Sequence, residues 1–243
     1  MSQKPYSERW SIYIDMEGFS ALYAEEDQIL WSLGELMRAI FRIGTRVYPN
    51  ETDRIFVHQT GDGFIILSDF HEPSPIRPIA IATVLLSHVA SSGRFARAAI
   101  SEGELADIVG CYPKEIRDAK DREGDVILGD GLMTIFPVMG TGLIRAVQVE
   151  KAGPSGPLLL IDSALRSRIP AEVQVTETGT AKHAPLSVDW IHLKHNLVSD
   201  IRAKADLTAY SPQEIEKKLI AYQRNYKLDK WVENLRRYLN LEI

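Results

Sequence analysis

The sequence predicts an α+β fold of the ferredoxin-like type, with a C-terminal αβ extension and a C-terminal helix. Two β-rich runs, 54–60 and 63–68, are joined by a Gly-Asp turn; helical patterns flank this pair, and an apolar strand precedes it. Elements in the order β α β β α β are typical of a split βαβ core. We expect a single domain over residues 1–243, with its core at about 8–165 and the extension at about 166–243.

Each element of the expected core follows from a local pattern. Residues 10–15 alternate and are rich in Ile, Tyr and Trp, which is typical of a strand. Apolar residues recur at helical spacing over residues 25–48, and Pro49 ends that helix. A second helix at about 78–92 is apolar nearly all round and should be buried. A strand is predicted at 94–105.

The second half of the chain gives a less regular pattern. Residues 110–125 are charged and predict an exposed loop or arm. A helix is expected within 130–152, then the short buried strand of the LLLID sequence, then one or two strands within 172–198. A Ser-Pro-Gln-Glu sequence beginning at Ser211 predicts the capped start of a C-terminal helix.

Composition limits the partners and the compartment. The chain has 243 residues, of which 45% are hydrophobic and 25% charged, which is average for a globular protein. A net charge of −5 argues against a nucleic-acid partner, which needs an excess of Lys and Arg. The single cysteine, Cys111, is typical of a reducing compartment. The longest apolar stretch, 79–90, is too short to span a membrane, and residues 1–10 do not form a signal peptide. We therefore predict a cytoplasmic protein with no membrane partner.

Two aspartates beside glycines indicate a site. In this topology the first strand pairs with the hairpin, so Asp15 at its end should approach Asp62 in the turn. Neighbouring carboxylates repel unless a cation lies between them, and oxygen ligands suit Mg²⁺ or Mn²⁺. Gly18 and Gly61 allow close approach of a ligand, and the amides of residues 17–20 are expected to face a triphosphate. The alternatives are a helix-capping aspartate and an ordinary Gly-Asp-Gly hairpin.

These motifs carry a family resemblance. The sequence DMEGFSAL, which begins at Asp15, resembles the Asp-Ile-x-Gly-Phe-Ser/Thr segment of class III nucleotidyl cyclases, and TGDGFIIL resembles their Gly-Asp hairpin. RAAISEG at 97–103 resembles their Arg-x-Gly-Ile-x-x-Gly strand, with Ala99 in place of a glycine. The resemblance covers residues 10–105.

The resemblance implies a two-metal reaction with catalytic roles for Asp15, Asp62 and Arg97. Two Mn²⁺ or Mg²⁺ ions would be held by the two aspartates and the backbone carbonyl of Met16. One ion would lower the pKa of the ribose 3′-hydroxyl and the other would neutralise the triphosphate. The 3′-oxygen would then attack the α-phosphorus, and pyrophosphate would leave.

The resemblance also implies how substrate is held and how the chain assembles. Amides of Gly18, Phe19 and Ser20 would hold the β- and γ-phosphates, while Arg97 adds positive charge. The family forms a head-to-tail homodimer in which the partner chain completes each site.

The base-reading position of the family holds His58, where lysine goes with adenine and glutamate with guanine. A neutral imidazole offers one donor and one acceptor, and so would read a different base edge. The alternative is a strand histidine satisfied by packing or water. The family's Asn…Arg pair aligns with Ile144 and Gln148, which carry no positive charge. Arg145 or Lys151 would substitute, or would lie on a solvated helix face.

This divergent pattern resembles the pyrimidine cyclases of bacterial antiphage systems, whose cyclic UMP or cyclic CMP is bound by a separate effector. We predict a uridylate cyclase that converts UTP to 3′,5′-cyclic UMP and pyrophosphate. The alternatives are a cytidylate or adenylate cyclase, a catalytically inactive nucleotide-binding module, and an interaction protein that docks through its C-terminal helix.

Overall fold

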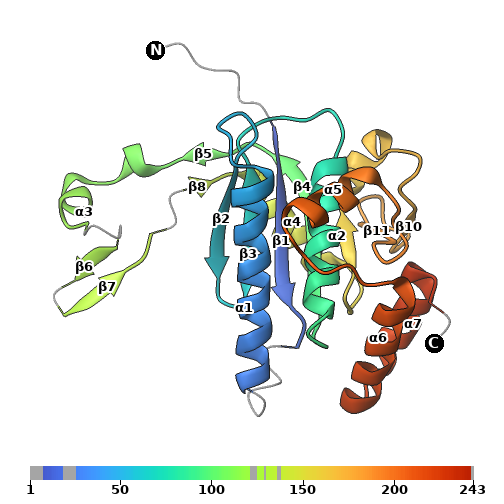
Figure 1. Ribbon diagram of the computed structural model, residues 1–243. Coiled ribbons are helices and arrows are strands. Elements are labelled where there is room, and N and C mark those ends of the chain that lie inside the picture. The colour runs from blue at the N-terminus through green and yellow to red at the C-terminus, as the bar shows by residue number, and fades with distance from the viewer. Residues whose placement is uncertain (1–7, 19–25, 121–124, 129, 136–137, 242–243) are drawn as a thin grey trace.

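The computed structural model describes residues 8–18, 26–120, 125–128, 130–135 and 138–241. Its centre is a seven-stranded sheet with helices packed on it (Figure 1). The sheet strands are β1 Arg9–Met16, β2 Ile55–Thr60, β3 Gly63–Ser68, β4 Ala96–Gly103, β9 Leu159–Ile161, β10 Val175–Glu177 and β11 Leu186–Val188. The helices are α1 Glu26–Arg42, α2 Ile76–Ala90, α3 Lys114–Asp118, α4 Thr141–Ala152, α5 Asn196–Lys204, α6 Pro212–Tyr226 and α7 Asp229–Leu239.

Strand order confirms the predicted ferredoxin-like core. The order across the sheet is β10-β11-β9-β4-β1-β3-β2. The four strands β4, β1, β3 and β2 pair antiparallel, and β1 lies between β4 and β3 as expected. β9 pairs parallel with β4 at the edge of these four strands. β11 then pairs with β9, and β10 pairs with β11, so the sheet continues beyond the four strands.

The two faces of the sheet are covered by different helices. Side chains at Ile12, Ile14 and Ile66 belong to the main core, together with buried residues of α1 and α2. The opposite face carries Ile65 and Leu67, which pack with Leu143 of α4 and with Tyr13. Successive strand residues point to opposite faces, so Tyr13 and Asp15 both lie on the α4 face.

Helix α2 is buried nearly all round, as its sequence predicts. One side packs on β1 and β4, and the other packs on α5 from the extension. The predicted helix over 25–48 is α1 followed by a π-helical turn, Ile43–Val47, and it ends before Pro49. Buried residues of the extension and of the core form one continuous hydrophobic cluster.

The predicted hairpin is present, with β2 and β3 joined by Gly61 and Asp62. Gly61 has a φ of 69°. Glycine at the first central position with positive φ is typical of a type II′ turn, whose twist matches that of the flanking strands. The turn therefore fixes where Asp62 is presented.

The described residues between 106 and 139 form an arm that projects from the sheet (Figure 1), and it includes the described part of 110–125, which was predicted to be an exposed loop or arm. Besides α3 it holds four short strands: β5 Ala106–Asp107, β6 Val126–Leu128, β7 Gly131–Met133 and β8 Val138–Met139. β5 pairs with β8 at its base, and β6 pairs with β7 near its tip.

The C-terminal segment departs from the prediction of a single helix. The capping box at Ser211 and Glu214 is present, but α6 ends at Tyr226, and the C-cap residue Lys227 has a φ of 53°. α7 then turns back so that Trp231 stacks on Tyr222 of α6, with 5.3 Å between ring centroids. Burial of these rings outweighs continuation of the helical pattern. Helix α5 was also missed by the sequence analysis.

Candidate active site

A cavity of about 310 Å³ lies where β1 ends, on the α4 face of the sheet. Its lining is polar and comes from four separate parts of the chain. The lining residues are Asp15, Met16, Glu17, Gly18, Asp62, Arg97 and Glu150. The carboxylates of Asp15 and Asp62 therefore line the same cavity, and Arg97 lines it beside them.

Strand register explains this meeting. Asp15 is paired with Gly63 on β3 and with Arg97 on β4, and Asp62 directly precedes Gly63. A Cβ atom at Gly63 would lie 2.9 Å from Oδ1 of Asp15 and 3.0 Å from the Ile14 carbonyl oxygen. Glycine at this position therefore leaves the room that the Asp15 carboxylate occupies.

Asp15 is an incompletely satisfied carboxylate. Its Oδ1 is buried and accepts no hydrogen bond from the described residues. Burial, and after it the charges of Asp62 and Glu150, raise the pKa of Asp15 to about 6. Hydrogen bonding to the Met16 backbone and, less strongly, to the Tyr13 side chain opposes this rise. Buried carboxylates in this state favour either a proton or a bound cation.

Glu17 and Glu150 complete the cavity and were missed by the sequence analysis. Burial raises the pKa of Glu17 to about 7; the Arg97 charge opposes that rise, and the Glu150 charge adds to it. Arg97 Nε lies 3.2 Å from Oε1 of Glu150, and the guanidinium also donates to the Glu150 backbone carbonyl. Arg97 therefore lines the cavity, and the Glu150 carboxylate already opposes its charge. Glu17 belongs to the DMEGFSAL motif, so its side chain could have been predicted as part of the site. No feature of the local sequence indicates a role for Glu150.

The remaining predicted phosphate-binding positions lie differently. Met16 and Gly18 line the cavity, and Gly18 is exposed with a φ of 75°. Gly61 shapes the hairpin turn and is not one of the lining residues. Phe19 and Ser20 lie outside the described residues.

His58 lines a different cavity, of about 420 Å³, together with Arg9, Phe56, Leu67 and other residues. It lies on β2 opposite Ile65. Burial lowers the pKa of His58, so its imidazole is neutral near pH 7. Within one chain, His58 therefore does not share the cavity of the two aspartates.

The positions aligned with the family's Asn…Arg pair lie on the exposed side of α4. Ile144 and Gln148 line an apolar groove of about 430 Å³, along with Lys151. Ile144 is 57% exposed. Arg145 instead donates to the Glu102 carbonyl oxygen at 3.2 Å, which holds it against β4.

Two wider features concern metals and membranes. Among the described residues, no group of three or more His, Cys, Asp or Glu side chains is arranged to hold a metal ion. The predicted metal site has two carboxylates and a backbone carbonyl, which is fewer carboxylates than such a group needs.

In the part of the chain that the structure describes, no helix has the length and apolar character needed to cross a membrane.

Comparison with known proteins shows similarity of structure. No protein-family model matches the sequence, and no curated protein matches it. A bacterial light-regulated adenylyl cyclase aligns with a TM-score of 0.50 and 11% identity, over 82% of this chain and 57% of that one. The guanylyl cyclase Cya2 aligns with a TM-score of 0.42 and 13% sequence identity, over 74% of this chain and 89% of that one. A class III adenylyl cyclase-like ATP-binding protein from Pseudomonas aeruginosa aligns with a TM-score of 0.44 and 15% sequence identity, over 80% of this chain and 40% of that one.

At such identities structural likeness establishes the fold alone. The chain spans little more than half of the light-regulated cyclase. Over that span it shares the mixed α+β fold of an adenylyl cyclase.

Proposed function

We propose that this chain is a metal-dependent nucleotidyl cyclase and that its favoured substrate is UTP, which it converts to 3′,5′-cyclic UMP and pyrophosphate. One observation carries the proposal: Asp15 and Asp62 line one cavity, and Oδ1 of Asp15 is buried there without a hydrogen-bond donor among the described residues. Paired carboxylates at the end of a central strand are suited to binding divalent cations.

The residues present fit a metal site. Burial and the neighbouring charges raise the pKa of Asp15 because they destabilise its ionised form, and a bound cation would stabilise that form. Asp15, Asp62 and the Met16 carbonyl would hold two Mn²⁺ or Mg²⁺ ions. When bound, such ions lower the pKa of the ribose 3′-hydroxyl and neutralise charge on the triphosphate.

The side chains of this chain set the conditions for binding. Four carboxylates and one guanidinium line the cavity, so it repels a bare triphosphate. Nucleotide and metal are therefore expected to bind together. Arg97 would exchange its contact with Glu150 for a phosphate oxygen, while the amides of Gly18, Phe19 and Ser20 orient the β- and γ-phosphates.

Base selection is the finer part of the proposal. Neutral His58 offers a donor and an acceptor where purine cyclases have lysine or glutamate. The preference for UTP rests on resemblance to pyrimidine cyclases of bacterial antiphage systems. The product would act as a messenger for a separate cyclic-nucleotide-binding effector, in the cytoplasm, and a lone cysteine suits that compartment.

A homodimer is part of the same proposal, because the partner would complete the site and bring His58 or its equivalent to the nucleotide. Exposed apolar side chains support it, on α4 and on the projecting arm. They are Ile127, Leu128, Met139 and Ile144, each about half exposed or more. Met139 and Ile144 line one groove, and exposed apolar surface of this kind commonly marks a protein interface.

A second candidate function is a nucleotide-binding module that does not turn over its ligand. The contact between Arg97 and Glu150 favours it, because it leaves the cavity with little positive charge. Ile144 and Gln148 do not supply the missing charge.

Incubation with each of UTP, CTP, ATP and GTP plus Mn²⁺, with products identified by chromatography and mass, tests the proposal. We expect cyclic UMP from the wild type and from a Glu233→Ala control, which changes an exposed residue of α7. Asp15→Ala and Asp62→Ala should lose turnover by about a thousandfold or more while remaining folded.

The other outcomes separate the alternatives. A cyclic product from CTP or ATP keeps the reaction and replaces the substrate. Retained turnover in Asp62→Ala rules out the two-carboxylate mechanism. Nucleotide binding without any product supports the binding module.

A further inference from the structure

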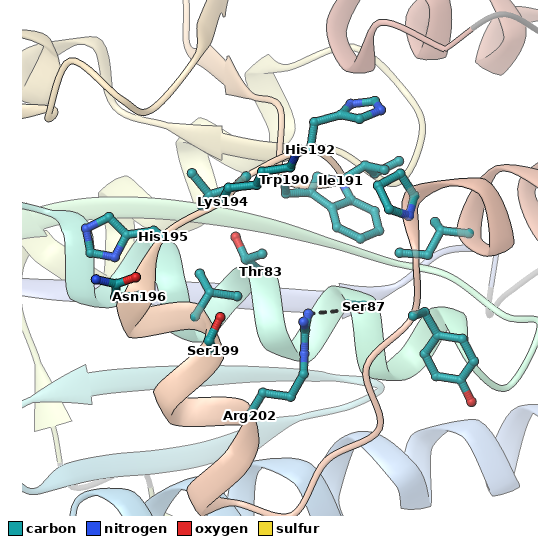
Figure 2. A pocket seen from close by; sticks show the side chains of 15 residues that line it. Thr83, Ser87, Trp190, Ile191, His192, Lys194, His195, Asn196, Ser199 and Arg202 are labelled. Atoms are coloured by element: carbon teal, nitrogen blue, oxygen red, sulfur yellow. Dashed lines mark hydrogen bonds between the residues drawn. The ribbon is translucent and has the colours of Figure 1, made fainter.

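A second cavity, of about 340 Å³, lies between α2 and α5 and is closed by the loop before α5 and by the start of α6. It shares no lining residue with the candidate active site. It opens on the side of α2 away from the sheet, whereas Asp15 faces α4 on the other side. Its volume is within the range of small-molecule pockets. Figure 2 shows the side chains that line it.

Thr83 of α2 is the first sign that the cavity is built for a ligand. It is 2% exposed and lines the cavity, yet its Oγ1 has no hydrogen-bond partner among the residues that the structure describes. A helical threonine normally donates to a carbonyl of the preceding turn. Buried hydroxyls without a partner are uncommon and destabilising, so a group that enters the cavity is expected to satisfy this one. Figure 2 places Thr83 in the middle of the lining residues.

Arg202 of α5 is the second sign. It is half-buried, and its Nη2 lies 3.4 Å from Oγ of Ser87, which is itself 2% exposed (Figure 2). No carboxylate of the described residues pairs with this guanidinium, and burial lowers the pKa of Arg202. A desolvated cation of this kind is stabilised by an anion that enters the cavity.

The other charged and titratable residues of the lining make the cavity electrostatically positive. Lys194 adds a second positive charge, and none of the lining residues is acidic. The two lining histidines already face carboxylates outside the cavity: His192 Nδ1 lies 3.0 Å from Asp189, and His195 Nε2 lies 3.6 Å from Glu172. The cavity is therefore positive in a chain of net charge −5.

One wall is apolar. Trp190, Ile191 and Ile215 line it and are buried. The Trp190 indole N–H donates to the Pro157 carbonyl oxygen at 2.9 Å, so the ring presents carbon to the cavity. A ligand that fills this space needs an apolar portion as well as a charge.

We propose that the cavity between α2 and α5 binds a small organic anion, whose phosphate or carboxylate group contacts Arg202 and Thr83 and whose apolar body lies against Trp190 and Ile215. This site is independent of the proposed cyclase reaction, because none of its residues belongs to that site. Phosphate monoesters and carboxylates share the chemistry required.

Isothermal titration calorimetry without metal or nucleotide tests the proposal. The probes are phenyl phosphate and benzoate as anions with an apolar ring, inorganic phosphate as an anion alone, and benzyl alcohol as the neutral counterpart. We expect at least one ring-bearing anion to bind, at least tenfold more tightly than benzyl alcohol, and inorganic phosphate to bind more weakly. Comparison of phenyl phosphate with benzoate identifies which anionic group is preferred.

Matched variants locate the binding. Arg202→Gln should weaken binding about tenfold or more, and Thr83→Val about threefold or more. Arg97→Gln in the candidate active site and Arg117→Gln on the exposed surface of α3 should bind like the wild type. Circular dichroism of each variant checks folding, and Thr83→Val decides the matter if Arg202→Gln does not fold.

Three results would overturn the proposal. The first is that neither ring-bearing anion binds the wild type. The second is binding that Arg97→Gln abolishes and that Arg202→Gln and Thr83→Val leave unchanged, which would place the anion in the candidate active site. The third is equal binding of inorganic phosphate and phenyl phosphate, which would remove the role of the apolar wall.

Discussion

Asp15 concentrates the electrostatics of the candidate site in one side chain. It ends a central strand, faces Asp62 and Glu150, and keeps Oδ1 buried without a donor among the described residues. Tyr13 lies two residues earlier on the same face and hydrogen-bonds to Asp15; burial, and after it the charges of Asp15 and Glu150, raise the pKa of this tyrosine. Such a carboxylate is unfavourable in an isolated fold and becomes favourable with a cation beside it.

This arrangement predicts how stability depends on pH in the absence of metal. The pKa of Asp15 is raised to about 6 and that of Glu17 to about 7, above the values of the unfolded chain. The unfolded state therefore releases its protons first, and the free energy of unfolding falls as pH rises from about 4 to about 7. Asp15→Asn should raise the melting temperature at about pH 7.5, and this gain should shrink towards about pH 4.

Thermal melts of the wild type, Asp15→Asn and an Asp118→Asn control across this pH range check the prediction. Mn²⁺ should raise the wild-type melting temperature at neutral pH and have little effect on Asp15→Asn. A wild type whose stability rises steadily from about pH 4 to about pH 7 would contradict the burial of these carboxylates.

The close contact of helix α4 with strand β4 positions Glu150 against Arg97. Gly103 of β4 faces Gly142 at the start of α4, where Ser101 Oγ also donates to the Gly142 carbonyl oxygen at 2.8 Å. α4 then runs along β4 to the end where Glu150 meets Arg97. Small residues at the first end thus set the position of a charged residue at the other.

Gly103→Ala should therefore destabilise the protein and disturb the site. The added Cβ would lie 2.4 Å from the Gly142 backbone nitrogen, so α4 must move away from the sheet. Overpacking of this kind costs about 1–3 kcal/mol in free energy of unfolding. Denaturant titration checks it beside Gly110→Ala, where nothing lies within 4 Å of the added Cβ and little change is expected. Equal stability of the two variants would show that α4 is not held as described.

Across the molecule, the described residues leave apolar side chains exposed in several places. Two of these places are the groove of α4, which Met139 of the arm also lines, and helix α1, where Phe41 is 68% exposed. A further exposed apolar side chain is Phe56 of β2, at 42%. The proposed homodimer uses the first surface, because that surface adjoins the α4 face on which the candidate site lies.

Ile144→Asp should therefore weaken the dimer, because it places a charge in the centre of the apolar groove. Sedimentation velocity over a range of protein concentrations checks the mass, and cyclase assays check whether activity falls with it. Phe41→Asp on α1 is the matched control and should leave the mass unchanged. A monomeric wild type, or a dimer lost through Phe41→Asp instead, would contradict this choice of surface.

Local patterns in the sequence were enough to predict the α+β fold, the central first strand, the hairpin turn at Gly61 and the capped start of α6. Each depends on local chemistry: side-chain periodicity, a glycine with positive φ, or a serine that caps a helix. The meeting of Asp15 with Asp62 was also predictable, because β1 pairs with β3 in this topology. Its use as a metal site stays a proposal.

The other features depend on contacts between distant parts of the chain. Glu150 comes to Arg97 from α4, more than fifty residues along the chain, and no local pattern marks it. The break between α6 and α7 follows from the stacking of Trp231 on Tyr222. The cavity of Thr83 and Arg202 exists because α5 packs on the outer side of α2. Long-range packing brings together residues whose local sequence gives no indication of the contact. These features could therefore be identified only from the folded structure.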